Sequence, residues 1–204
     1  MSATPITLFS AGSDREIRRW RIDDAANIPR VVEIEPNTPI IQHETSVYAL
    51  RFDNDDDLWT ASADGTSKCL SRERGWEADT TLQHGDYVRA VAIDERGGWV
   101  VTAGRDEDVK VWDKASGKLH HVYEGHFEEV TGLVVVGQVA VSVGIDATVR
   151  QWSLTAEGLG EAVTEAEDAR NGVEKEREEV PKSKVGGLTE EEERELEDLM
   201  GDGE

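Results

Sequence analysis

The sequence holds a single cysteine, Cys69, among its 204 residues. One cysteine excludes an internal disulfide framework and a metal site built from several thiolates, and it fits a reducing compartment. The chain also lacks any window close to the roughly 18 consecutive apolar residues of a membrane-spanning helix, and its N-terminal segment has no basic leader followed by an apolar run. These absences predict an intracellular protein, in the cytoplasm or the nucleus, that does not bind membranes.

Basic residues are scarce. The chain has 22 Lys and Arg against 44 Asp and Glu, which gives a formal net charge of -22. This balance disfavours direct binding to nucleic acid. The charge is uneven, because residues 155–204 hold 18 acidic and 6 basic residues and no Phe, Trp or Tyr. We therefore expect a folded body over residues 1–154 and an acidic, disordered linker over residues 155–187.

Signatures of enzymes and metalloproteins are missing as well. No phosphate-binding loop, dinucleotide-binding fingerprint or zinc-ligand spacing occurs, so we expect no cofactor and no metal. Helical periodicity is also absent from residues 1–154, where short apolar segments alternate at period two between Asp and Gly turn signals. This pattern predicts an all-β fold.

One sequence unit occurs four times. In each copy a Ser or Thr stands four residues before an Asp, and a Trp or Leu follows six residues after it. The aligned residues are Ser10, Asp14 and Trp20; Thr60, Asp64 and Leu70; Thr102, Asp106 and Trp112; and Ser142, Asp146 and Trp152. The last three units are preceded by His43, His84 and His126, each followed by an alternating apolar strand. We expect three strands per unit plus a fourth that leads to the next His.

These features resemble the WD-repeat family, whose period is about 40 to 45 residues with four strands per unit. Gly125-His126 and Trp112-Asp113 match the two signatures of the family, and the resemblance covers residues 6–154. It implies a β-propeller of about four blades and about 14 strands. The first unit begins at its second strand and the fourth lacks an outer strand, so we expect an incomplete or open arc. A partial gene product, an arc completed by a second copy or another protein, and an unseen divergent blade all remain open.

The resemblance assigns the repeated residues to hydrogen-bonded sets that fix each blade. The third set is His84, Thr102, Asp106 and Trp112, and the fourth is His126, Ser142, Asp146 and Trp152. Both are complete, so these two blades should be the best ordered. The second set has His43, Thr60 and Asp64 but Leu70 in place of Trp, and the first has Ser10, Asp14 and Trp20 without a His. A nucleophilic triad is one site with one geometry, whereas these residues recur in every unit, so we expect no enzyme activity.

The C-terminal residues 188–204 carry a different pattern. Thr189 and Glu192 form a capping box, and Leu196, Leu199 and Met200 share one helical face, with Leu188 at the start. We expect a short amphipathic, acidic helix that docks on a partner protein. The alternatives are that it packs on its own propeller or frays in solvent.

The expected function is that of a non-catalytic protein-interaction scaffold or adaptor subunit of a multiprotein complex. By resemblance, partners bind a rim that includes Tyr48, Arg89, Thr131, Arg105 and Ile145. Tyrosine and arginine dominate interface energetics, so Tyr48, Arg89 and Arg105 are the best anchors.

Two other functions are weighed against this one. A histone- or ribosome-assembly chaperone would use the acidic tail on basic cargo. A ubiquitin-ligase substrate receptor is disfavoured, because some family members carry Trp-Asp-X-Arg, whereas Trp112-Asp113-Lys114 is followed here by Ala115.

Overall fold

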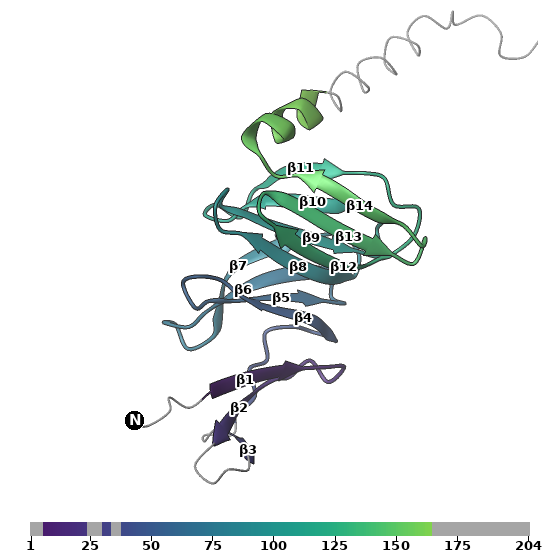
Figure 1. Ribbon diagram of the computed structural model, residues 1–204. Helices are drawn as coiled ribbons and strands as arrows, with labels where there is room; N and C mark the ends of the chain where they lie inside the picture. The colour runs from purple at the N-terminus through teal and green to yellow at the C-terminus, as the bar shows by residue number, and fades with distance from the viewer. Residues whose placement is uncertain (1–5, 24–29, 34–37, 165–204) are drawn as a thin grey trace, which may run out of the picture. The chain divides into compact units, whose positions relative to one another are not determined.

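The computed structural model describes residues 6–23, 30–33 and 38–164. Fourteen strands lie within these residues, and they form four separate antiparallel sheets (Figure 1). The strands are β1 (Ile6–Ala11), β2 (Ile17–Asp23), β3 (Arg30–Glu33), β4 (Val47–Phe52), β5 (Leu58–Ser62), β6 (Thr66–Ser71), β7 (Glu77–Gln83), β8 (Val88–Asp94), β9 (Trp99–Gly104), β10 (Val109–Asp113), β11 (Leu119–Tyr123), β12 (Val130–Val136), β13 (Val139–Gly144) and β14 (Val149–Ser153).

Each sheet is a meander in which strands adjacent in sequence pair with each other. We call the sheets blade 1 (β1-β2-β3), blade 2 (β4-β5-β6-β7), blade 3 (β8-β9-β10-β11) and blade 4 (β12-β13-β14). Blades 2 and 3 have four strands. Within the described residues, blade 1 has three strands, β1 to β3, and blade 4 has three strands, β12 to β14. The prediction of blade-like sheets in an unclosed array is confirmed.

The hydrophobic core is divided into three clusters, each of which lies between two successive blades. The first joins Ile17 of blade 1 to Leu58 and Leu70 of blade 2. The second packs residues of blade 2 on residues of blade 3, and the third packs blade 3 on blade 4. Because blade 2 is covered on both faces, all five residues of β5 are buried. The alternating apolar pattern of each strand therefore serves two neighbouring blades at once.

A partly buried lysine, Lys114, links blades 2 and 3. Lys114 Nζ lies 3.0 Å from Glu95 Oε2 of its own blade and 3.2 Å from Asp53 Oδ2 of blade 2. Asp53 Oδ2 also accepts a hydrogen bond from Trp59 Nε1 at 3.1 Å. Burial alone would lower the pKa of Lys114, but Glu95 and Asp53 raise it above its usual value. The Lys114 ammonium group thus pairs with one carboxylate from each blade, and these charge-assisted contacts link blade 2 to blade 3.

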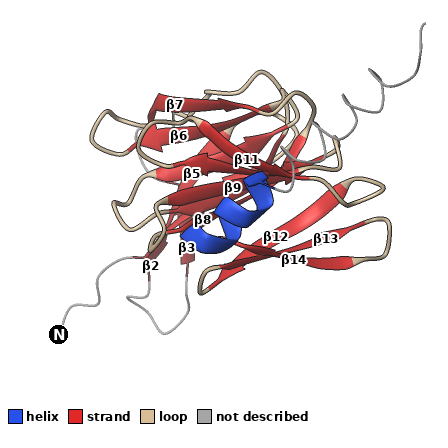
Figure 2. Cartoon of the chain, turned by 90° about the horizontal axis from the view of Figure 1, so that it is seen from above, coloured by secondary structure: helices blue, strands red, loops and turns tan. Residues whose placement is uncertain are grey.

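A helix over residues 156–164 follows β14 (Figure 2). It lies where we expected the disordered linker to begin, so that expectation is wrong for these residues. The physical reason is burial: Leu154 and Leu159 are fully buried in the core between blades 3 and 4. The compact unit extends to Val163 rather than to residue 154. Within the described residues, no helix has the length and apolar character needed to span a membrane.

Candidate functional site

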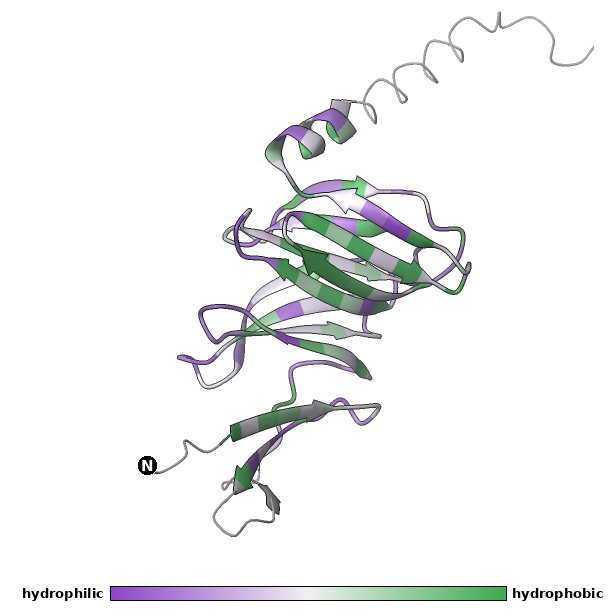
Figure 3. Cartoon of the chain, viewed as in Figure 1, coloured by the Kyte–Doolittle hydropathy of each residue, from purple (hydrophilic) through white to green (hydrophobic). Residues whose placement is uncertain are grey.

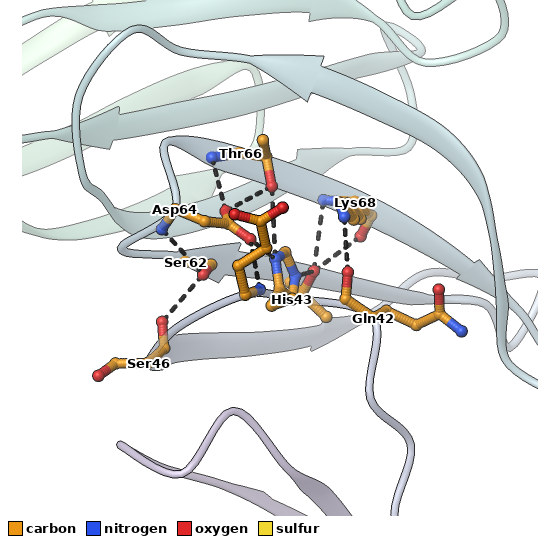
Figure 4. A network of polar contacts seen from close by, with 9 residues as sticks. Gln42, His43, Ser46, Ser62, Asp64, Thr66 and Lys68 are labelled. Atoms are coloured by element: carbon orange, nitrogen blue, oxygen red, sulfur yellow. Dashed lines mark hydrogen bonds and ion pairs between the residues drawn. The ribbon is translucent and has the colours of Figure 1, made fainter.

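Blade 2 contains a buried hydrogen-bond network around His43 (Figure 4). His43 Nδ1 lies 2.8 Å from Asp64 Oδ2, and His43 Nε2 lies 2.7 Å from Thr60 Oγ1. Asp64 also accepts hydrogen bonds from the Glu44 amide and, at 2.6 Å, from the Thr66 hydroxyl. The network connects the segment before β4 to the β5–β6 turn, so it fixes the entry of the chain into the blade. The network forms although Leu70 occupies the position that holds tryptophan in the other blades.

The charges of this network are set by its surroundings. Burial would raise the pKa of Asp64, but hydrogen bonds from Thr66, His43 and the Glu44 amide lower it to about 2. Burial lowers the pKa of His43 below its usual value, although Asp64 opposes this effect. A neutral His43 donates from Nδ1 to Asp64 and accepts from the Thr60 hydroxyl at Nε2. The network therefore holds one negative charge at neutral pH.

Blade 4 brings all four expected residues together. His126 Nδ1 lies 2.9 Å from Asp146 Oδ2, and His126 Nε2 lies 2.7 Å from Ser142 Oγ. Ser142 Oγ in turn accepts a hydrogen bond from Trp152 Nε1 at 2.8 Å. The chain of contacts runs from β14 through β13 to the segment before β12, as the resemblance implies.

Blade 3 differs from the expected complete set. Trp112 Nε1 donates to Thr102 Oγ1 at 2.7 Å, and His84 Nδ1 lies 2.8 Å from Asp106 Oδ2. His84 Nε2 has no hydrogen-bond partner among the described residues, so the set is divided into two pairs. Lys110 Nζ binds both Asp106 Oδ2 and the His84 carbonyl oxygen at 2.6 Å. The expectation that the third unit has the complete network is therefore corrected.

The residue two positions after the repeat Asp explains this difference. It is Thr66 in blade 2 and Thr148 in blade 4, and both hydroxyls donate to the carboxylate. In blade 3 the same position holds Asp108, whose pKa is raised by burial and by the charge of Asp106. A second carboxylate cannot donate, so Lys110 neutralises the pair instead. Sequence reasoning missed this position, although the repeat alignment contained it.

In blade 1 the set of repeat residues makes a single hydrogen bond between Trp20 and Ser10. Trp20 Nε1 donates to Ser10 Oγ at 2.6 Å. Asp14 pairs with Arg18 at 2.8 Å, and Arg18 also pairs with Glu16, which occupies the position of Asp108. Blades 1 and 3 thus share an acid-acid-base arrangement, whereas blades 2 and 4 share an acid-threonine-base arrangement.

These networks have the properties of scaffolding rather than of a reactive centre. The hydroxyl oxygens of Thr60 and Ser142 are buried and fully engaged inside their sheets. Among the described residues, Asp53, Asp57 and Cys69 form one group of possible metal ligands, whose ligand atoms all lie within 4.8 Å of one another. Burial and the neighbouring carboxylates raise the pKa of the Cys69 thiol to about 12, and Asp53 already binds Trp59 and Lys114. This group therefore offers neither a thiolate nor a free carboxylate pair.

Three of the five predicted rim residues lie at a structural irregularity that recurs in three blades. The pairing of the first two strands skips one residue in each blade, and the skipped residues are Tyr48, Arg89 and Thr131. A β-bulge re-aims the side chain of the extra residue and bends the strand. The three residues therefore occupy the same place at the beginning of β4, β8 and β12. The sequence located these positions but gave no sign of the bulge.

Arginine and aromatic side chains are paired at and near these three positions. The Arg89 guanidinium lies 4.2 Å from the ring centre of Tyr48 in the preceding blade, and it pairs with Glu129 of the following blade. Arg105 lies 5.2 Å from the ring centre of Tyr87. Ile145, before the repeat Asp of blade 4, is exposed. Tyr87 and Glu129 directly precede β8 and β12. They were missed because the prediction considered the residue after the first-strand Val and the residue before the repeat Asp, but not the residue before the first strand.

A third pair extends the same arrangement to blade 4. The Arg150 guanidinium lies 5.4 Å from the ring centre of Phe127, the residue after the repeat His. Phe127 is 75% exposed. The predicted docking-helix residues Leu188, Leu196, Leu199 and Met200 lie outside the described residues.

Known proteins resemble this chain over the residues that form the blades. The family model "WD domain, G-beta repeat" matches residues 35–69 and 76–113. An uncharacterized WD repeat-containing protein of Schizosaccharomyces pombe is 34% identical over 148 residues, which are 72% of this chain and 38% of that protein. The chromatin assembly factor 1 subunit FAS2 homolog of Oryza sativa subsp. japonica is 27% identical over 160 residues, which are 74% of this chain and 32% of that protein.

The chain thus spans about a third of the length of these two relatives. The matched repeats coincide with strands of blades 2 and 3, which are the two four-stranded sheets. Blades 1 and 4 continue the same strand pattern on either side. Because its repeats, its sheets and its relatives agree, the chain belongs to the WD-repeat family.

Proposed function

We propose that this chain is a non-catalytic adaptor that binds partner proteins through the rim formed by Tyr48, Arg89, Arg105, Thr131 and Ile145. WD-repeat proteins generally act as protein-interaction scaffolds and are typically non-catalytic. The observation that carries the proposal is the contact series from Tyr48 through Arg89 to Glu129, which crosses three successive blades. Such a series presents one continuous surface rather than three separate loops.

The rim is suited to binding because four of its residues are exposed and Arg89, which is half-buried, is held in place by Tyr48 and Glu129. Tyr48 is 40% exposed, yet its ring is held by Arg89. A partner that binds a fixed side chain loses less conformational entropy than one that binds a free side chain. Arginine and tyrosine are also the residue types that most often supply interface energy. The rim therefore supplies anchors of the right chemistry in a preset geometry.

The test is to isolate the proteins that associate with the full chain in cells and to compare rim variants with a matched control. Tyr48→Ala and Arg105→Ala should each remove partners that the wild type retains. Arg74→Ala is the control, because Arg74 is an exposed arginine paired with Asp79 in the β6–β7 turn, at the opposite end of the strands. Equal partner sets for all three variants would contradict the proposal, provided that circular dichroism shows each variant to be folded.

An intracellular location is part of the same proposal. Cys69 is a buried, free thiol within the core between blades 2 and 3. A chain with one unpaired cysteine and no disulfide fits a reducing compartment. We also propose that the acidic linker, predicted for residues 155–187, is confined to residues 165–187 and that residues 188–204 form the docking helix.

A second candidate function is that of a chaperone for basic cargo such as histones. Its support is the acidic segment, together with the similarity to a chromatin assembly factor subunit. Removal of residues 165–204 should abolish a salt-sensitive interaction with core histones, measured by titration at low and at high ionic strength. The truncation is placed after residue 164, because removal of the chain from residue 155 would also delete Leu159, which is buried in the core between blades 3 and 4. Unchanged histone binding by the shortened chain would contradict this candidate.

A further inference from the structure

Three arginine side chains at one end of the strands each lie over an aromatic ring. The pairs are Arg89 with Tyr48, Arg105 with Tyr87, and Arg150 with Phe127. All three rings are exposed. In Figure 3, strands β12 and β13 are mostly in the hydrophobic colours, whereas many of the loops that join strands are in the hydrophilic colours. The exposed rings are thus apolar groups at the polar ends of the blades, and each is paired with a cation.

Two of these arginines, Arg89 and Arg105, belong to blade 3 and lie close together along its backbone. Val88 at the start of β8 is paired with Gly104 at the end of β9, so the two arginines directly follow one pair of opposed residues. The Arg105 amide donates a hydrogen bond to the Tyr87 carbonyl at 2.9 Å, which fixes the two segments to each other. One short part of the rim therefore carries two guanidinium groups.

The stacked arginines keep hydrogen-bond donors available. The five N–H donors of a guanidinium group lie in its plane, so a ring that covers one face leaves them free. Among the described residues, no carboxylate pairs with the guanidinium group of Arg105 or Arg150. Arg89 uses its Nε on Glu129, and its two Nη groups have no hydrogen-bond partner within residues 6–23, 30–33 and 38–164.

The carboxylates nearest to Arg105 in sequence are held in other contacts. Asp106 follows Arg105, but its carboxylate binds His84 and Lys110. One carboxylate oxygen of Asp86 accepts a hydrogen bond from the amide of the residue that follows it, at 2.7 Å. The donors of Arg105 therefore face solvent in the free chain, where a bound partner can supply acceptors in place of water.

We propose that the partner segment that binds the rim is acidic, and that its Asp or Glu carboxylates bind the free donors of Arg105 and Arg89. This inference rests on the proposed function of the rim and adds the chemistry of the partner. The two oxygens of a carboxylate match two parallel N–H groups of a guanidinium fork, so the contact is bidentate and charge-assisted. The rings of Tyr48 and Tyr87 support the two guanidinium planes, which reduces the entropy lost on binding.

The negative charge of the chain makes this site selective. The net charge is -22, so most of the surface repels an acidic segment. Such a segment binds only where cations with free donors are exposed, and repulsion elsewhere suppresses wrong modes of binding. The same charge argues against a nucleic acid as the ligand, because its many phosphates would meet this repulsion over a much longer surface.

The first test measures the binding of the full chain to three matched synthetic peptides by fluorescence anisotropy. In each peptide, glycine alternates with one other residue, which is glutamate, glutamine or phosphoserine, and both peptide ends are blocked. The glutamate peptide should bind about tenfold more tightly than the isosteric, neutral glutamine peptide. Equal binding of these two peptides would overturn the proposal. Binding of the phosphoserine peptide about tenfold more tightly than the glutamate peptide would also overturn it, because the site would then be specific for phosphate.

Substitutions in blade 3 test which arginine is responsible. Arg105→Ala should weaken binding of the glutamate peptide about tenfold, and Arg105→Lys should have an intermediate effect, because lysine keeps the charge but lacks the planar fork. Arg96→Ala is the control, since Arg96 is an exposed arginine of the same blade in the β8–β9 turn, at the opposite end of the strands. Circular dichroism should show each variant to be folded. Wild-type affinity in Arg105→Ala, or an equal loss in the control, would overturn the proposal.

Chemical coupling locates the bound peptide. A carbodiimide joins a carboxylate to a nearby amine, so Arg105→Lys provides an amine at the rim and Arg96→Lys provides a matched amine at the opposite end of the strands. Mass spectrometry should find the glutamate peptide attached at position 105 of the first variant, with little attachment at position 96 of the second. Equal yields at the two positions would mean that the peptide has no preferred site, which contradicts the proposal.

The results also separate this inference from the proposed function. If Tyr48→Ala and Arg105→Ala remove cellular partners while the chain shows no preference for the glutamate peptide, the rim binds partners of another chemistry and only this inference fails. If the two variants also retain every cellular partner, the proposed function fails with it.

Discussion

At the scale of single residues, the position two places after each repeat Asp decides how the carboxylate is satisfied. Thr66 and Thr148 donate a hydroxyl to it, and the neighbouring histidine then completes its bonds to the Ser or Thr hydroxyl. Asp108 brings a second negative charge, and Lys110 is drawn between the two acids. A hydrogen-bond donor at this position therefore accompanies an intact network, and a carboxylate accompanies a divided one.

The divided network of blade 3 predicts unequal effects of removing the central hydroxyl. Ser142→Ala should leave both His126 Nε2 and Trp152 Nε1 without a partner, which costs about 1–3 kcal/mol for each buried group left unsatisfied. Thr102→Val keeps the side-chain shape and should leave only Trp112 Nε1 unpaired. The free energy of unfolding in urea should therefore fall further for Ser142→Ala. Equal losses would show that the blade 3 network is whole in solution.

The buried Asp64 and His43 also predict how stability depends on pH. The pKa of His43 is lowered by burial in the folded chain, so acidification below about 6.5 protonates the unfolded chain first and favours unfolding. The pKa of Asp64 is lowered to about 2, so its contribution is present above pH 4 and is lost between pH 4 and pH 2. Thermal melting curves across this range should show a steady loss of stability toward low pH.

A matched pair of variants tests whether Asp64 causes the loss of stability between pH 4 and pH 2. Asp64→Asn should be less stable at pH 7 but should lose less stability between pH 4 and pH 2 than the wild type. Asp56→Asn is the control, because Asp56 is an exposed turn residue paired with Arg72 and such pairs contribute little. If both variants kept the wild-type slope, Asp64 would not be the titrating group.

At the scale of elements, the bulge at the start of β8 brings two backbone segments into close contact. The Tyr87 carbonyl lies against Gly104 at the end of β9 and accepts a hydrogen bond from the Arg105 amide at 2.9 Å. A Cβ on Gly104 would overlap the Tyr87 carbonyl oxygen, which is backbone and cannot rotate away. In blade 3, glycine at this position is therefore required by the close approach of the Tyr87 carbonyl, whereas blade 2 has the same bulge with Ser62 at the equivalent position.

Gly104→Ala should accordingly destabilise the chain by about 1–3 kcal/mol, as is usual for a steric conflict in a packed region. Gly12→Ala is a matched control at the same repeat position of blade 1, where the nearest atom to a new Cβ is Asp14 Oδ1 at 3.9 Å. The measurement is the denaturant midpoint of each variant. A similar shift for both would mean that the β8 bulge relaxes to accept a side chain.

The sequence predicted most elements but not all of the contacts between them. The four repeats, their strand count and the short blades at both ends followed from the spacing of Asp, Trp and His, because these residues recur at fixed places in the sheet. The helix at residues 156–164 was missed, since its composition resembles the acidic segment that follows and only the burial of Leu159 distinguishes it. The bulges and the Lys114 cluster were missed because they depend on pairing between segments far apart in sequence.

At the scale of the whole molecule, the chain is a linear series of blades in which each blade packs on its sequence neighbours. Stability in such arrays is the sum of the intrinsic stability of each repeat and of the contacts with its neighbours. Within the part of the chain that the structure describes, blades 2 and 3 have a neighbour on both faces, whereas blades 1 and 4 have one. The middle of the series should therefore hold together when the ends open.

Hydrogen exchange should reveal this gradient. Amides of β5, β9 and β10 should be the most protected, because these strands lie inside four-stranded sheets with buried faces. Amides of β1 and β2 should exchange faster. Uniform protection across all four blades would indicate a single cooperative unit and contradict this description.

Because of its position, Cys69 can report how often blades 2 and 3 separate. Its thiol lies in the cluster shared by blades 2 and 3, and its pKa of about 12 keeps it unreactive at neutral pH. A small alkylating reagent can therefore modify it only during the moments when these two blades separate. The labelling rate would report how often blades 2 and 3 separate, and a partner protein that holds these blades together would slow it without contacting the sulfur.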